Sequence, residues 1–61
     1  MDIRQRIEAF LRERGMTPTR FGEEALNDRR LVFDLRRGRE LRPRTRERLL
    51  AWIDAQTGRE P

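Results

Sequence analysis

The sequence predicts an all-α fold, a compact domain of four short helices, and three observations support this class. Apolar residues recur at spacings of three and four, as Ile3, Ile7, Phe10 and Leu11 do. Gly, Pro, Asn and Thr separate these segments, and such residues stop and start helices. No stretch alternates apolar and polar residues as a half-buried strand would. The 61 residues suffice for one domain.

The first two helices have clear boundaries. The apolar stripe that begins at Ile3 predicts a helix over residues 2–14, which Gly15 ends. Thr17 is a preferred N-cap and Pro is favoured at the first helical position, so the second helix is expected over 18–26. The residues of this helix expected to face inward are Phe21, Ala25 and Leu26.

Gly22 lies inside the second predicted helix, where glycine costs roughly 1 kcal/mol relative to Ala. One interpretation is a loosely packed helix. The other is the close approach of another helix backbone, which only a small residue permits. We favour the second.

Asn27 and Asp28 form the next break. Asn tolerates the left-handed conformation that ends helices, and Asp28 is a good N-cap for a third helix over 29–37. Gly38 ends that helix. Two short helices joined by so tight a turn predict a helix-turn-helix domain.

The fourth helix is expected over 45–56, with Thr45 as its N-cap after a basic loop that contains Pro43. Its apolar stripe consists of Leu49, Leu50 and Ile53, and Trp52 extends it sideways. The expected domain is therefore 1–56, and residues 57–61 are expected to be a frayed tail.

Composition excludes several classes of function. There is no Cys or His, which removes disulfides and the usual metal sites. There is also no Tyr or Lys, and Glu23 and Glu24 are adjacent on a helix and point apart, so we expect neither an enzyme nor a cofactor. Without an apolar membrane span or a signal peptide, a soluble cytoplasmic protein is expected. No small-molecule ligand is expected, since no ligand domain fits.

Positive charge is concentrated in one segment. All fifteen basic residues are Arg, and the net charge is +4. Residues 28–48 hold nine Arg and four acidic residues, whereas residues 1–27 hold five of each. Codon bias in a GC-rich genome is one explanation of the use of Arg in place of Lys, and the planar bidentate donor group of Arg is the other. The location of the net charge matters more than its size. A cationic patch of this kind attracts phosphate backbones.

The outward face of the third helix is the candidate binding surface. At about 100° per residue, the face opposite Leu31, Val32 and Leu35 carries Arg30, Phe33 and Arg37. The residues that flank this outward face are Arg29 and Asp34. A solvated face with one stray Phe would look the same. The alternative is a face that enters the DNA major groove, where Arg contacts guanine and an apolar side chain contacts the thymine methyl.

Two other segments are candidate phosphate contacts. The loop "RELRPRTR" over 39–46 is either solvated, with local pairs such as Glu40 with Arg44, or a phosphate clamp. The start of the second helix offers free N–H groups and a positive dipole end. The residues expected to contact phosphate are Thr17, Thr19, Arg20, Arg39, Arg42, Arg44 and Arg46.

Residues 17–38, "TPTRFGEEALNDRRLVFDLRRG", resemble the helix-turn-helix of the lambda-repressor/Cro-like superfamily, also called the XRE family. The positions that carry the resemblance are Phe21-Gly22, Val32, Leu35 and Gly38, followed by the basic loop and Thr45. The chain departs from the family pattern at Leu26, where Gly is usual, and at Arg36, where Glu is common. Many members also carry a fifth, dimerising helix, which we expect this chain to lack.

The resemblance implies sequence-specific binding of double-stranded DNA by a homodimer on a palindromic operator, in transcriptional control. Its base-contacting positions correspond to Arg29, Arg30, Phe33 and Asp34, with Arg37 at the edge. We expect a repressor. The alternatives are a protein-interaction module of the same fold, such as an antitoxin or an RNA-polymerase-binding factor, and an RNA-binding protein.

Trp52 has two interpretations. It is either the dimer contact or the residue that closes the core against the first helix. With Phe10 it would also supply the second exposed apolar patch expected of a protein-interaction module.

Overall fold

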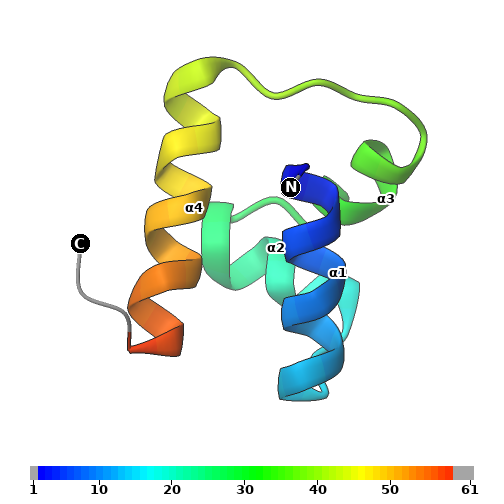
Figure 1. Cartoon of the computed structure of the whole chain (residues 1–61). Coiled ribbons are helices and arrows are strands. Elements are labelled where there is room, and N and C mark those ends of the chain that lie inside the picture. The colour runs from blue at the N-terminus through cyan, green and yellow to red at the C-terminus, as the bar shows by residue number, and fades with distance from the viewer. Residues whose placement is uncertain (1, 59–61) are drawn as a thin grey trace.

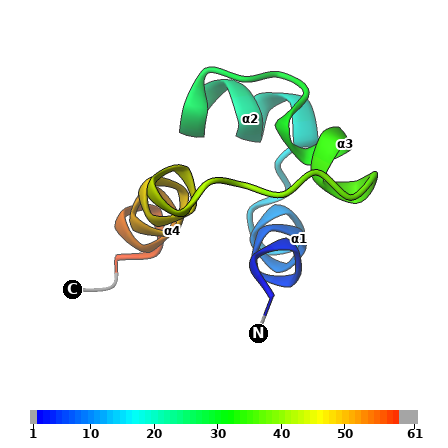
Figure 2. The ribbon, with the colours of Figure 1, turned by 90° about the horizontal axis from the view of Figure 1, so that it is seen from above.

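The computed structural model describes residues 2–58, which form four helices and no strand, so the predicted all-α class is confirmed. The helices are α1 (Ile3–Arg14), α2 (Pro18–Leu26), α3 (Leu31–Arg36) and α4 (Pro43–Thr57). Helix α2 lies behind and between α1 and α4, and α3 lies at one end of the molecule (Figures 1 and 2). None of these helices is long and apolar enough to cross a membrane.

Three aromatic rings from three helices pack together, two of them buried and the third half-buried against the core. Phe10 of α1, Phe21 of α2 and Trp52 of α4 meet edge to face, with ring centroids 5.4 to 5.6 Å apart. Such pairs contribute about 0.5–1.5 kcal/mol beyond the area that they bury. Aliphatic side chains surround the rings, and these buried residues are Ile3, Ile7, Leu11, Leu31, Val32, Leu35, Leu49 and Ile53.

The turn between α2 and α3 has the predicted chemistry. Asn27 adopts the left-handed conformation with φ 54°, and its N–H bonds to Glu23 O at 3.0 Å. Gly22 is buried against this turn, since a Cβ there would lie 2.0 Å from the carbonyl oxygen of Asp28. The expected close approach is therefore present, although the turn backbone makes it rather than a helix.

The third helix begins later than predicted. The expected span was 29–37 with Asp28 as N-cap, but Arg29 and Arg30 form a turn closed by Leu31 N–H to Asp28 O at 3.2 Å. Arg30 has φ −95° and ψ 0°, outside the helical region, so the regular helix begins at Leu31. Asp28 still accepts the hydrogen bond from Arg30 N–H, at 3.1 Å, that its predicted capping role requires, but it caps the turn that precedes the regular helix.

The fourth helix begins earlier than predicted, at Pro43 rather than Thr45. The fixed φ of Pro suits the first helical position, and the residue before Pro is restricted to extended conformations. Arg42 accordingly has φ −66° and ψ 150° and is the N-cap. Thr57 is the last helical residue, so the expected frayed tail is wrong at this position, and residues 59–61 lie outside the described range.

Candidate nucleic-acid interface

The outward face of α3 is hollowed and basic. Phe33 is 42% exposed and is the largest hydrophobic side chain that residues 2–58 leave exposed. The residues that line the hollow around it are Arg30, Phe33, Asp34, Arg36 and Arg37. On the opposite side of α3, Leu31, Val32 and Leu35 are buried in the core. The face that the helical spacing predicts to point outward therefore does so.

Four of the five residues predicted to contact bases line this one hollow, and Arg29 is the exception. Its Nε lies 2.8 Å from Glu23 Oε1 of α2. Arg36 lines the hollow but was not among the predicted residues. Its spacing of three residues from Phe33, which makes the two neighbours on a helix surface, was the signal that could have identified it.

Arg36 connects α3 to α1 through a bidentate ion pair. Its Nε donates to Glu8 Oε2 at 2.8 Å, and its Nη2 donates to Glu8 Oε1 at 2.9 Å. This hydrogen-bonded guanidinium lowers the pKa of Glu8 below its ordinary value, against a smaller opposing effect of burial. The Arg36 guanidinium carbon also lies 5.9 Å from the centre of the Phe33 ring.

Arg39 is held by two carboxylates, one before α3 and one in its first turn. Its Nη1 lies 3.1 Å from Asp28 Oδ2, before the helix, and 3.3 Å from Asp34 Oδ2, within it. Arg39 was predicted to contact phosphate and Asp34 to contact a base. In the structure they form an intramolecular cluster with Asp28 that fixes the short helix between its flanking segments.

The arginines of residues 28–48 thus divide into two groups. Arg29, Arg36 and Arg39 pair with carboxylates of the protein. The other six arginines of this segment make no ion pair within residues 2–58. They are Arg30, Arg37, Arg42, Arg44, Arg46 and Arg48. The net positive charge of residues 28–48 is therefore carried by the six arginines without an ion pair, and not equally by all nine arginines of the segment.

The first turn of α4 combines cations with a positive helix end. It contains no acidic residue, and its N-cap makes no side-chain hydrogen bond to the free N–H groups. Arg42, Arg44 and Arg46 are exposed there. Cations at a helix N-terminus are unfavourable, whereas an anion there is stabilised. In Figure 1 the connection from α3, at the right, crosses the top of the molecule to this turn, at the upper left.

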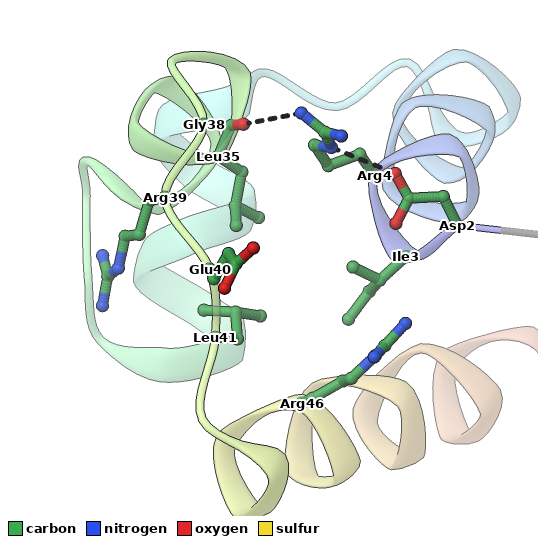
Figure 3. A pocket seen from close by; sticks show the side chains of 9 residues that line it. All are labelled: Asp2, Ile3, Arg4, Leu35, Gly38, Arg39, Glu40, Leu41 and Arg46. Carbon is green, nitrogen blue, oxygen red and sulfur yellow. Dashed lines mark hydrogen bonds and ion pairs between the residues drawn. The ribbon is translucent and has the colours of Figure 1, made fainter.

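Arg46 differs from Arg42 and Arg44 in its surroundings. It lines a second hollow, of about 410 Å³, between the start of α1, the end of α3 and the loop that leads to α4. Figure 3 shows Arg46 and Glu40 directed into this space, and Arg39 directed away from it. Arg4, which donates to Asp2 Oδ2 at 3.0 Å, closes the other side. The hollow carries charges of both signs.

The start of α2 carries the remaining candidate phosphate contacts, Thr17, Thr19 and Arg20. Thr17 Oγ1 accepts a hydrogen bond from Arg20 N–H at 3.2 Å, so its predicted role as the cap is confirmed. Arg20 pairs with Glu24 of the same helix at 2.5 Å, which raises the pKa of the guanidinium. Thr19 is half-buried. Two of the three candidate phosphate contacts here therefore have partners within the protein.

Trp52 and Phe10 do not form an exposed apolar patch. Phe10 is buried, and the Trp52 ring packs edge to face on it with centroids 5.6 Å apart. The contacts of Trp52 therefore agree with the second interpretation, in which Trp52 closes the core against α1. The patch that would have indicated a protein-interaction module is absent from residues 2–58.

Residues 2–58 also contain no cluster of three or more side chains suited to hold a metal ion. No protein-family model, curated protein or solved structure matches this chain. The resemblance to the lambda-repressor/Cro-like superfamily therefore rests on the residues that carry it.

Proposed function

We propose that this chain is the DNA-binding domain of a sequence-specific transcriptional regulator of the lambda-repressor/Cro-like type, acting as a repressor. The observation that carries this proposal is the outward face of α3. The exposed Phe33 stands there between Arg30 and Arg37, neither of which pairs with a carboxylate of residues 2–58. Such a face offers hydrogen-bond donors and an apolar contact together, which suits base edges in a major groove.

The contacts have distinct roles in this proposal. Arg30 and Arg37 stand at the N-cap and C-cap of α3 and donate to guanine O6 and N7. Phe33, between them, touches a thymine methyl group. Arg42 and Arg44, exposed at the start of α4, bind phosphates and orient the domain. Arg39 and Asp34 act on one another and not on DNA.

The alternative of a protein-interaction module has less support. Its expected sign was a second exposed apolar patch, but of the two aromatic residues that would form it Phe10 is buried and Trp52 is half-buried against it. The exposed apolar side chain lies instead among arginines, in surroundings that suit a polyanion better than a protein partner.

We also propose that two copies bind together, because one short recognition helix covers few base pairs. A palindromic operator would then have half-sites about one helical turn apart. Since Trp52 has its contacts within the core, the contact between the two copies need not involve it.

The test of the proposal is selection of bound duplexes from a random pool, followed by binding measurements at several salt concentrations. Enrichment of one motif is expected, and a palindrome would indicate a dimer. Affinity should fall steeply with salt, by about 0.9 in log K per log salt for each phosphate contact. Absence of any enriched duplex, or of binding at about micromolar concentration in low salt, would refute DNA binding.

Variants then separate the two kinds of contact. Arg30→Ala should cost about 1–3 kcal/mol on the selected duplex and relax discrimination at one base pair. Arg44→Ala should weaken binding to every duplex about equally and reduce the salt slope by about 0.9. Arg12→Ala removes the same charge from the exposed surface of α1 and is the matched control. An equal effect of Arg30→Ala on selected and random duplexes would remove Arg30 from the base-contacting set.

A further inference from the structure

Arg36 lies between a carboxylate of another helix and the exposed ring of α3. The two ends of its planar fork are both occupied by Glu8 of α1, at 2.8 and 2.9 Å. The same guanidinium lies 5.9 Å from the centre of the Phe33 ring, within the range of a cation–π contact. Glu8 is thereby coupled to Phe33 without touching it.

The bidentate geometry of the Arg36–Glu8 pair fixes the orientation of the Arg36 guanidinium. A single-point ion pair leaves a guanidinium free to rotate, whereas two parallel hydrogen bonds fix the orientation of its plane. The Arg36 side chain is 46% exposed, and its guanidinium is positioned by the ion pair with Glu8 and by the contact with the Phe33 ring. Without Glu8, this arginine would join the unpaired cations that line the hollow on α3.

We propose that Glu8 is a positioning residue for recognition, resting on the proposed function: through Arg36 it orients the Phe33 ring toward a thymine methyl group and withholds one cation from the phosphates. Glu8 lies on α1 and need not touch DNA for this role. A second consequence follows from the charge. Loss of Glu8 should strengthen binding to DNA of any sequence while it weakens discrimination.

The test uses the full chain and the selected duplex, with deoxyuridine in place of the thymidine that Phe33 faces. This substitution removes only the methyl group. The parent should bind the uracil duplex about fourfold more weakly, the factor that corresponds to roughly 0.8 kcal/mol for one buried methyl-sized group. In Glu8→Gln this fourfold difference should disappear. The slope of log K against log salt should become steeper by about 0.9, because Arg36 gains a phosphate contact.

Two further variants isolate the mechanism. Arg36→Lys keeps the charge but cannot form the planar fork, so it should lose the thymine preference. Glu13→Gln makes the same charge change on the exposed surface of α1, at a residue that forms no ion pair within 2–58, and should keep the preference. A thymine preference that persists in both Glu8→Gln and Arg36→Lys would overturn the proposal.

Nuclear magnetic resonance of the free protein makes this test independent of DNA binding. Glu8→Gln should move the Arg36 Nε–H signal and the Phe33 ring signals, whereas Glu13→Gln should leave both in place. Unchanged ring signals in Glu8→Gln would refute the positioning role even if the parent binds DNA. Failure of the parent to bind any duplex would refute the proposed function, and the ring signals would then decide the positioning of Phe33 by themselves.

Discussion

Replacement of Gly22 by alanine tests the contact that joins α2 to the turn before α3. A Cβ at this position would lie 2.0 Å from Asp28 O, 3.1 Å from Asp28 C and 3.3 Å from Leu31 Cβ. An ordinary contact between such atoms is about 3.5 Å or longer. The two nearest of these atoms belong to the backbone of Asp28. The turn is held in place by the hydrogen bond that Asp28 N–H donates to Gly22 O at 2.9 Å. The turn would therefore have to move away from α2.

The magnitude follows from two opposing effects. Overpacking costs about 1–3 kcal/mol, and a collision with fixed backbone belongs at the upper end. Alanine recovers about 1 kcal/mol of helix propensity. We therefore expect Gly22→Ala to lower the free energy of unfolding by about 2 kcal/mol. For a domain of this size that corresponds to a fall in Tm of about 8–16 °C, out of a total stability of about 3–9 kcal/mol.

Thermal and urea denaturation followed by circular dichroism would measure the change. Ala51→Gly, on the exposed side of α4, measures the propensity effect alone and should cost about 1 kcal/mol. If Gly22→Ala is as stable as the parent or more stable, the close approach of the turn to α2 does not exist, and the reasoning fails.

Three further predictions concern the core, a cap and pH. Trp52→Ala removes one ring from the aromatic cluster and should cost about 3 kcal/mol in urea denaturation, whereas Trp52→Phe should cost less than about 1.5 kcal/mol. An unchanged stability in Trp52→Ala would exclude a packing role. Thr17→Ala deletes the cap that accepts Arg20 N–H and should lower stability by about 1 kcal/mol, and no change would show that the cap contributes nothing. Because Arg36 lowers the pKa of Glu8, their pair stabilises the fold above the unfolded pKa of about 4.3, and this stability is lost as pH falls through the lower folded pKa. Glu8→Gln should therefore flatten the decline in stability on acidification, and an unchanged decline would assign it to other carboxylates.

The helical periodicity predicted much of the fold because it depends on which side chains can be buried together. The stripe of α1, the span of α2 and the left-handed Asn27 follow from local rules, and the structure agrees with them. The largest errors in helix boundaries, two residues each, fall at the starts of α3 and α4. At the start of α4, Thr45 and Pro43 both favour a helix start, and the restriction of φ at Pro43 prevailed.

The outward face of α3 was also predictable, since it is the complement of the buried stripe. The division of its arginines into paired and unpaired groups was not. Glu8 is 28 residues from Arg36, and Arg39 finds both Asp28 and Asp34 only once the turn and helix are folded. The helical periodicity predicts only which side of a helix a side chain faces. Whether an arginine forms an ion pair depends on which carboxylate the folded chain brings within reach.

The acid-free first turn of α4 should make the free domain and the proposed DNA complex respond differently to ionic strength. Three cations beside a positive helix end repel one another and the dipole. Screening over a Debye length of about 10 Å at 0.1 M salt relieves that repulsion, so added salt should favour the folded state. The same screening weakens association with a polyanion. At this turn salt therefore acts with opposite signs on folding and on binding, and a multivalent anion such as sulfate should stabilise the turn while it competes with DNA for it.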